Sequence, residues 1–195
     1  MLGRVILVTG TPCVGKTSVA SLLASQFKAL YLNLTELALK EDLVMSNDEE
    51  RNSMIIDENL MRLKIRQIIV ANLDRDIVID GHYAVGVVPR EFTTRVIVLR
   101  RDPVELRKLM KISGFSGKKL WENLASEILD VCLSIALNTY EESRVCEVDV
   151  SSKSVKDVVN EIKSILDRSR ECRVGIVDWL GKLERKGLLE EFMRI

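Results

Sequence analysis

Short runs of apolar, largely β-branched residues recur along the chain, and longer segments with apolar residues at helical spacing separate them. A run in which nearly every position is apolar is typical of a strand that is buried on both faces of a sheet. We therefore predict strands at residues 4–9, 30–32, 77–80, 95–99 and 145–150.

The intervening segments carry the periodicity of amphipathic helices. The clearest examples are the segment after the first run, with Val19, Leu22, Leu23 and Phe27 on one side, and residues 154–166, with Val155, Val158, Val159, Ile162 and Ile165. Strands that alternate with helices, without tight hairpin signals, predict a parallel sheet covered by helices on both faces. The predicted fold class is therefore α/β, doubly wound.

Two segments break this rhythm by their polarity, residues 33–57 and residues 112–122. We expect both to be mobile flaps that project from the sheet. The first contains the acidic run Asp48-Glu49-Glu50, which we interpret as a solvated face.

A further apolar pattern follows residue 173 and predicts a pair of helices that is broken near Gly187. Its apolar positions are Trp179, Leu180, Leu183, Leu188, Leu189 and Phe192. We expect this C-terminal extension, residues 169–195, to pack back onto the sheet, and docking against a partner helix is the alternative.

Length and composition favour one domain with a core of its own, since the chain has 195 residues. Its 29 basic and 29 acidic residues balance, so no global charge indicates a nucleic acid or an anionic membrane as partner. No apolar run reaches the ~18 residues of a membrane span, so we expect a cytoplasmic protein. We also expect a monomer, although no particular residue fixes the oligomeric state.

The four cysteines are scattered, without the spacing of a zinc site or the density of a disulfide scaffold. We interpret Cys132, Cys146 and Cys172 as buried thiols. Cys13 differs because it lies within a glycine-containing loop that follows the first predicted strand.

This loop has the sequence GTPCVGKT, from Gly10 to Thr17, and fits the phosphate-loop pattern G-x-x-x-x-G-K-[ST]. Its glycines allow the backbone N–H groups to surround phosphate oxygens at the start of a helix. Lys16 is expected to bridge the β- and γ-phosphates, Thr17 to ligate Mg²⁺, and Ser18 to reach the α-phosphate region. The pattern predicts a P-loop NTPase that binds a nucleoside triphosphate with Mg²⁺.

Cys13 occupies a position at which many such loops have glycine. A thiol beside so much positive charge has a lowered pKa, which makes redox sensitivity one interpretation. A tolerated small side chain is the other, and we favour it.

Polar side chains follow two of the predicted strands, at the edge of a parallel sheet where ligands bind. Asp80 ends one strand and is expected to orient Mg²⁺ or its bound water. His82, the single histidine, comes two residues later and is a candidate for phosphate contact or for orienting water. Arg100 and Arg101 follow another strand and could neutralise charge during phosphoryl transfer, or form a surface pair.

The chain resembles the adenylate kinase isoenzyme 6 family in four elements: residues 10–18, the Asp80-Gly-His82 element, Leu99-Arg100, and the stretch GFSGKKLWEN at residues 114–123. The resemblance covers residues 1–168. It implies the nucleoside monophosphate kinase fold, adenylate kinase and ATPase activities, and a role in maturation of the small ribosomal subunit, with binding to one of its proteins.

The resemblance also implies a role for each part of the site. Residues 33–56 would bind the monophosphate, AMP, and residues 112–122 would form the lid. Asp80 and His82 would support Mg²⁺ placement and hydrolysis, with Lys16 and Arg100 as further catalytic residues. The expected ATP-binding residues are Gly10, Cys13, Val14, Gly15, Lys16, Thr17 and Ser18.

The chain departs from the family in the lid, where Ser113 occupies the usual position of an arginine. Arg107, Lys118 or Lys119 could replace that cation, although a lysine lacks the bidentate fork of arginine. We therefore expect a weak kinase with measurable ATPase activity.

Two other functions compete with a monophosphate kinase. One is a nucleotide-switched ribosome assembly factor with ATPase but little kinase activity. The other is a regulatory GTPase, which the sequence disfavours because it contains no Asn-Lys-x-Asp guanine element.

Overall fold

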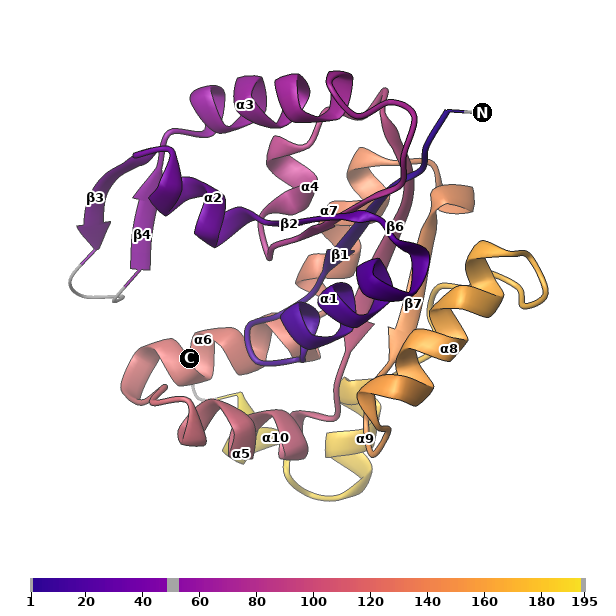
Figure 1. Cartoon of the computed structure of the whole chain (residues 1–195). Helices are drawn as coiled ribbons and strands as arrows, with labels where there is room; N and C mark the ends of the chain where they lie inside the picture. Colours follow the sequence, from indigo (N-terminus) through magenta and orange to yellow (C-terminus); the bar gives the residue numbers. More distant parts are fainter. Residues whose placement is uncertain (1, 49–52, 194–195) are drawn as a thin grey trace.

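The five predicted apolar runs form the strands of one parallel sheet in the computed structural model, which describes residues 2–48 and 53–193 (Figure 1). The strands are β1 (Val5–Thr9), β2 (Leu30–Asn33), β5 (Ile77–Asp80), β6 (Thr93–Arg100) and β7 (Val145–Asp149). They lie in the order β2-β5-β1-β6-β7, and each neighbouring pair is parallel. The predicted α/β class is confirmed.

Helices cover both faces of the sheet, and each face has its own apolar core. One core includes side chains of α1 (Lys16–Phe27), α6 (Gly117–Ile128) and α8 (Val155–Leu166). The other includes those of α3 (Glu58–Val70), α4 (Ala84–Val87) and α7 (Val131–Thr139). The remaining helices of this part of the chain are α2 (Leu34–Lys40), α5 (Pro103–Ile112) and the short 3₁₀ turn η1 (Glu142–Arg144).

Helix starts follow ordinary capping chemistry. The Ser154 hydroxyl accepts a hydrogen bond from the Asp157 amide at the start of α8, and the carboxylate of Asp57 accepts two from the first turn of α3. At α5, Asp102 accepts from the Val104 amide, and Pro103 stands at the helix start, where a missing N–H costs nothing. These caps fix where each helix leaves the sheet edge.

The first predicted flap contains a hairpin that the sequence did not indicate. Strands β3 (Val44–Asp48) and β4 (Ser53–Ile56) pair antiparallel and form a separate two-stranded sheet. The sequence shows no tight hairpin signal here, because four residues separate the two strands and residues such as Asn47 have low strand propensity. Glu49 and Glu50 of the acidic run lie outside the described residues.

The second predicted flap, residues 112–122, is a corner between two helices. It comprises the end of α5, the turn at residues 113–116 and the first turns of α6. Gly114 and Gly117 both have positive φ, +85° and +53°, which lets the chain reverse between the helices. In Figure 1 this corner and the β3–β4 hairpin lie on the same side of the sheet.

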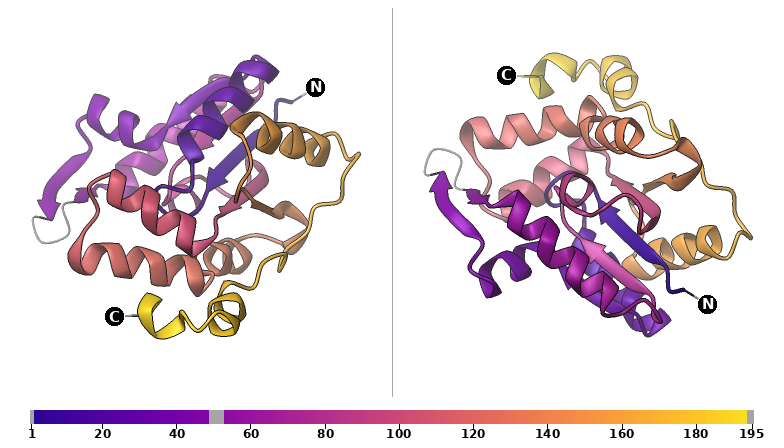
Figure 2. Two further views of the ribbon diagram at one scale, coloured as in Figure 1. Left: turned by 90° about the horizontal axis from the view of Figure 1, so that it is seen from below. Right: turned by 90° about the horizontal axis from the view of Figure 1, so that it is seen from above.

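The C-terminal extension forms the predicted helix pair, α9 (Trp179–Arg185) and α10 (Leu189–Phe192), with a break at Gly187, whose φ is +64°. Trp179, Leu183 and Phe192 are buried. The extension packs back onto the protein: its helices α9 and α10 lie against α5 and α6 (Figure 2). The segment before these helices runs along the edge strand β7 of the sheet.

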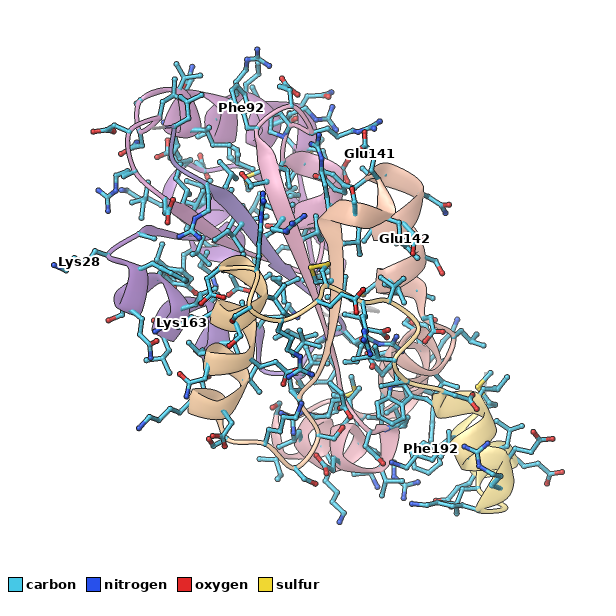
Figure 3. All side chains as sticks on the ribbon, turned by 90° about the vertical axis from the view of Figure 1, so that its right-hand side faces the viewer. Lys28, Phe92, Glu141, Glu142, Lys163 and Phe192 are labelled. Atoms are coloured by element: carbon cyan, nitrogen blue, oxygen red, sulfur yellow. A yellow bond between two sulfur atoms is a disulfide. The ribbon has the colours of Figure 1, made fainter. Side chains whose placement is uncertain are left out.

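Cys146 and Cys172 form a disulfide, which corrects their interpretation as buried thiols. Figure 3 shows the bond between β7 and the part of the extension that precedes α9. The Glu147 amide also donates to the Arg173 carbonyl, at 2.8 Å, so this segment runs along β7. The two cysteines are 26 residues apart, and only the return of the chain along β7 brings them together.

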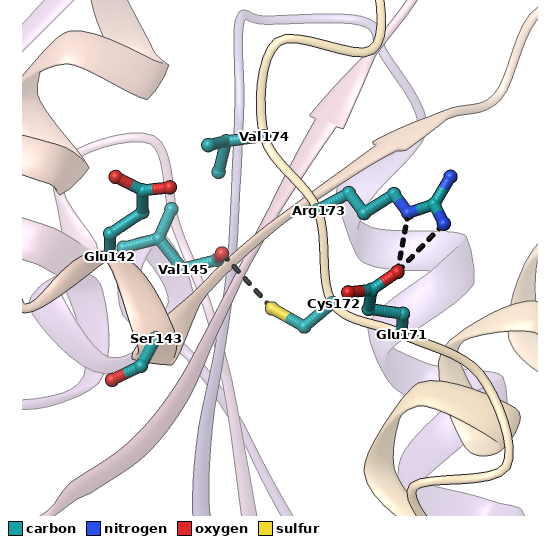
Figure 4. Close-up of a pocket in the computed structure, with 7 residues that line it drawn as sticks. All are labelled: Glu142, Ser143, Val145, Glu171, Cys172, Arg173 and Val174. Atoms are coloured by element: carbon teal, nitrogen blue, oxygen red, sulfur yellow. Dashed lines mark hydrogen bonds and ion pairs between the residues drawn. The ribbon is translucent and has the colours of Figure 1, made fainter.

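A surface groove of about 450 Å³ lies beside this disulfide (Figure 4). Its lining residues are Glu142, Ser143, Val145, Glu171, Cys172, Arg173 and Val174. Val145 is the first residue of β7, so the groove lies at the amino edge of the strands, opposite to the edge where α/β sheets bind ligands.

The disulfide should contribute about 3 kcal/mol to the free energy of unfolding, because it closes a loop of intermediate length in the unfolded chain. We expect Cys172→Ser to lower the unfolding free energy by this amount in chemical denaturation. Cys13→Ser, which alters a free thiol, is the control. A reductant should lower the stability of the unaltered protein and leave that of Cys172→Ser unchanged; equal effects on both would contradict the disulfide.

Candidate phosphate-binding site

The loop between β1 and α1 adopts a conformation that requires glycine at two positions. Gly10 and Gly15 have φ values of +139° and +106°, which side chains rarely adopt. A Cβ atom on Gly10 would also lie 2.5 Å from the Leu99 carbonyl oxygen. The loop therefore passes closely over the end of β6 and enters α1 at Lys16, as the sequence pattern predicts.

Two non-glycine residues of the loop have particular conformations. Cys13 has a φ of +67°, the left-handed region that glycine favours, and its half-buried thiol is free. Val14 is fully buried and joins the apolar core below the loop. Val14 therefore anchors the loop with its side chain, and only its backbone is available to a phosphate.

The ammonium group of Lys16 lies within the loop. Its Nζ donates to the carbonyl oxygens of Gly10, at 3.0 Å, and Thr11, at 2.9 Å. Burial lowers the pKa of Lys16, and the nearby Asp80 carboxylate opposes this shift. A cation held by two neutral carbonyls in a desolvated loop is well suited to exchange them for phosphate oxygens.

Asp80 lies at the end of β5 and accepts three hydrogen bonds on one oxygen. Its Oδ2 lies 2.8 Å from Thr17 Oγ1, 2.9 Å from Asn33 Nδ2 and 3.1 Å from the Tyr31 hydroxyl. Thr17 and Asp80, both predicted from the sequence, are thus brought into direct contact. Asn33 faces Asp80 across the β2–β5 pair, and strand register could have indicated this partner.

The Thr17–Asp80 pair fits a magnesium site. Among the described residues no cluster of three or more His, Cys, Asp or Glu side chains could hold a metal by itself. Mg²⁺ in kinases takes few protein ligands, together with water and phosphate oxygens. The Thr17 hydroxyl would supply one ligand, and Asp80 would orient a metal-bound water.

His82 follows β5, and its backbone carbonyl accepts a hydrogen bond from the Thr9 hydroxyl at 3.3 Å. Desolvation at the edge of the loop, followed by the charges of Lys16 and Lys119, lowers the pKa of His82 to about 4. The imidazole is therefore neutral at pH 7. It can accept or donate a hydrogen bond, but it does not bring a positive charge to the site.

Arg100 does not reach the phosphate loop, which corrects its predicted place among the catalytic groups. Its side chain is only 2% exposed and forms ion pairs with Glu127, Asp130 and Glu147. These three carboxylates come from α6, the α6–α7 turn and β7, and the Glu127 backbone carbonyl accepts a further hydrogen bond from Nη2 at 2.8 Å. Arg100 therefore links elements of the fold, and its buried guanidinium faces these carboxylates rather than the phosphate loop.

Arg101 is the arginine that contacts the loop. Its Nε and Nη2 lie 3.4 Å and 3.3 Å from the Val14 carbonyl oxygen, and its Nη1 lies 3.1 Å from Glu105 Oε2. The sequence placed both arginines at this edge, but it could not distinguish which side chain turns inward.

Comparison of the sequence with known proteins identifies the family of this chain. Residues 6–130 match the family described as "AAA domain". Proteins named "Putative adenylate kinase" are similar over almost the whole chain. The one from Thermococcus onnurineus is 37% identical over 90% of this chain and 91% of its own length. Those from Methanococcus maripaludis and Saccharolobus islandicus are each 32% identical, over 90% and 98% of this chain and 95% of their own lengths. The chain belongs to this adenylate kinase-like P-loop family.

Solved structures of kinases share the fold of this adenylate kinase-like protein. A gluconokinase from Sinorhizobium meliloti has a TM-score of 0.54 at 17% identity and covers 87% of this chain and 95% of its own. A thymidylate kinase from Candida albicans has a TM-score of 0.54 at 15% identity, over 86% and 92%. The chain thus has the P-loop kinase fold. Among its described residues no helix combines the length and apolar character that a membrane crossing requires.

The three cations that could replace a lid arginine are placed differently. Arg107 pairs with Glu191 and lies 4.2 Å from the ring centroid of Phe192, so the C-terminal extension holds it. The Lys118 side chain is 85% exposed and lies 3.7 Å from Glu122. Lys119 lies over the Phe115 ring, and its charge acts on His82. Of these three cations, Lys119 is therefore the one whose charge acts on His82.

The lowered pKa of His82 can be measured without ambiguity because the chain has one histidine. In protein freed of nucleotide and metal, we expect the imidazole NMR resonances to titrate with a midpoint of about 4. Since the folded state resists protonation, the free energy of unfolding should fall as the pH drops from about 6.5, the ordinary value, through that midpoint. Lys119→Met should raise the midpoint. A midpoint of about 6.5 in the folded protein would contradict the predicted environment.

Proposed function

We propose that this nucleotide kinase transfers the γ-phosphoryl group of Mg·ATP to AMP and so forms two ADP. The observation that carries the proposal is the contact between Thr17 and Asp80 beside a loop that encloses Lys16. The names of the archaeal relatives support adenine nucleotides as substrates. The acceptor's identity is the part of the proposal that rests on these relatives and on the resemblance to adenylate kinase isoenzyme 6.

Each part of the proposed mechanism concerns position and charge, because phosphoryl transfer needs little covalent chemistry from the protein. ATP would lie along residues 10–18, with Lys16 on its β- and γ-phosphates. Mg²⁺, when bound, neutralises phosphate charge, and Thr17 and Asp80 would hold it. AMP would bind against residues 33–56, which comprise α2 and the β3–β4 hairpin. Closure over it by residues 112–122 would exclude water.

ATP hydrolysis should accompany transfer. Ser113, at the turn after α5, carries no charge to the phosphates, and neutral His82 stands where it could orient a water. An incompletely closed lid admits water to the γ-phosphate, and part of the turnover then goes to inorganic phosphate. Lys119 is the group that we propose limits this leakage.

A role in maturation of the small ribosomal subunit remains a second proposal, which the Asp80-Gly-His82 element supports through its resemblance to the isoenzyme 6 family. In that case the chain would act as a nucleotide-switched assembly factor and bind a small-subunit ribosomal protein. Nucleotide-dependent binding of such a protein, with little AMP turnover, would favour this function over the metabolic one.

The reaction is tested by product analysis with Mg·ATP against AMP, CMP, GMP and UMP. We expect ADP to form fastest with AMP, and inorganic phosphate to form slowly without any acceptor. Lys16→Ala should abolish both products, since the lysine is needed for either reaction. Undiminished turnover by Lys16→Ala would contradict the site, and equal rates with all four monophosphates would contradict AMP as the acceptor.

Lys119→Met tests the lid. We expect this variant to lower kcat with AMP by about a hundredfold, as removal of one charge-stabilising donor does in other enzymes. Lys118→Met is the matched control, because this neighbouring lysine points into solvent, and its kcat should stay within about twofold. Equal losses in the two variants would contradict a specific role for Lys119.

A further inference from the structure

A buried carboxylate, Glu127 of α6, joins the phosphate loop to the C-terminal extension. Its side chain is 1% exposed. Thr11 of the loop donates its hydroxyl to Oε2 at 2.6 Å. The indole Nε1 of Trp179, the first residue of α9, donates to Oε1 at 3.1 Å. One carboxylate thus connects two segments that lie 168 residues apart in the chain (179 minus 11).

Two further donors complete the environment of Glu127. Arg100 Nε lies 2.9 Å from Oε1, and the Arg101 backbone amide lies 3.0 Å from the same oxygen. Four donors thus reach this carboxylate, three of them at Oε1 and the Thr11 hydroxyl at Oε2. A buried charge with this many partners has one favourable orientation, because any rotation leaves a donor or an oxygen unsatisfied.

Thr11 passes this constraint to the catalytic lysine. Its hydroxyl is held by Glu127, and its carbonyl oxygen accepts a hydrogen bond from Lys16 Nζ at 2.9 Å. A second connection runs through Arg101, whose amide donates to Glu127 and whose guanidinium donates to the Val14 carbonyl. Glu127 is therefore connected to both halves of the loop, although α6 contributes no residue to the loop itself.

The extension is fastened so that Trp179 cannot move independently. Trp179 is 4% exposed, and Lys182 lies over its ring at 5.0 Å while pairing with Asp102 at 2.6 Å. The segment before it is tied to β7 by the disulfide and by the Ile176 amide, which donates to Glu147 at 2.8 Å. The indole is thus a fixed donor to Oε1 of Glu127, while Thr11 donates to the other oxygen, Oε2.

We propose that Glu127 and Trp179 are positioning residues for the phosphate loop, and that the C-terminal extension thereby sets the affinity for ATP. This inference rests on the proposed function, since it concerns the loop assigned to ATP. The Trp179 indole donates a hydrogen bond to the Glu127 carboxylate, which also accepts one from the Thr11 hydroxyl. The Thr11 carbonyl in turn accepts a hydrogen bond from Lys16 Nζ. Neither Glu127 nor Trp179 belongs to the phosphate loop itself.

Trp179→Phe removes the indole donor and keeps most of the apolar contact. We expect it to raise the dissociation constant for Mg·ATP by about threefold to tenfold, the value of one hydrogen bond, and to leave the KM for AMP unchanged. Leu183→Val is the matched control, since Leu183 is buried in the same helix and does not contact Glu127. It should lower the melting temperature as much as Trp179→Phe without changing ATP affinity.

A pair of variants at Thr11 tests the other end of the connection even if Trp179→Phe fails to fold. Thr11→Val should weaken ATP binding by about threefold to tenfold, and Thr11→Ser, which keeps the hydroxyl, should restore it. Trp179→Phe with Thr11→Val should bind ATP no more weakly than the worse single variant, because both changes break one connection.

Calorimetric titration with Mg·ATP separates this inference from the proposed reaction, because it requires no acceptor. Unchanged ATP affinity in Trp179→Phe, with a melting temperature lowered as in Leu183→Val, would overturn the positioning role while leaving the kinase reaction intact. Equal affinities of Thr11→Val and Thr11→Ser would overturn it as well. The expected loss of affinity in a chain that fails to phosphorylate AMP would support the positioning role and reject the acceptor.

Discussion

The side chain of Arg100 is almost completely enclosed at the carboxyl end of β6, and the surrounding elements are arranged around its charge. A buried guanidinium is tolerated only when carboxylates neutralise it and use its donors. Glu127 and Glu147 do so from α6 and β7, and Asp130 does so from the next turn. Burial raises the pKa of Glu147, and Arg100 opposes this shift. Loss of one partner would leave an uncompensated charge, at a cost of about 3–5 kcal/mol.

The ion cluster of Arg100 with Glu127, Asp130 and Glu147 positions the elements around the phosphate loop, although none of these residues is part of the loop. It holds α6 against the end of β6, and Gly10 of the phosphate loop passes over the same strand end. The adjacent Arg101 can therefore reach the loop, while Arg100 cannot. Arg100 forms ion pairs that stabilise the fold, whereas the neighbouring Arg101 contacts the phosphate loop. The same cluster pairs Glu127 with the Arg100 guanidinium, while the Glu127 carboxylate also accepts hydrogen bonds from Thr11 and Trp179.

The local part of this structure could be predicted from the sequence. Apolar runs indicated the five parallel strands, and the phosphate-loop pattern indicated the strand, loop and helix around Lys16 and Thr17. Contacts between distant segments could not be predicted. The Cys146–Cys172 disulfide depends on the path of the extension along β7, and the burial of Arg100 depends on three carboxylates from other elements. Glu127 left one overlooked signal, because it interrupts the apolar stripe of Leu120, Leu124 and Ile128 on α6.

The destination of the γ-phosphoryl group is the central question for a site that combines a complete phosphate loop with a proposed lid, in which Ser113 stands where an arginine is expected. It can be followed with ATP labelled in the γ-phosphoryl group, incubated with Mg²⁺ and an excess of AMP. We expect most of the label in the β-phosphate of newly formed ADP and a smaller part in inorganic phosphate. Recovery of all the label in inorganic phosphate, with AMP unconsumed, would contradict the kinase reaction proposed for this chain.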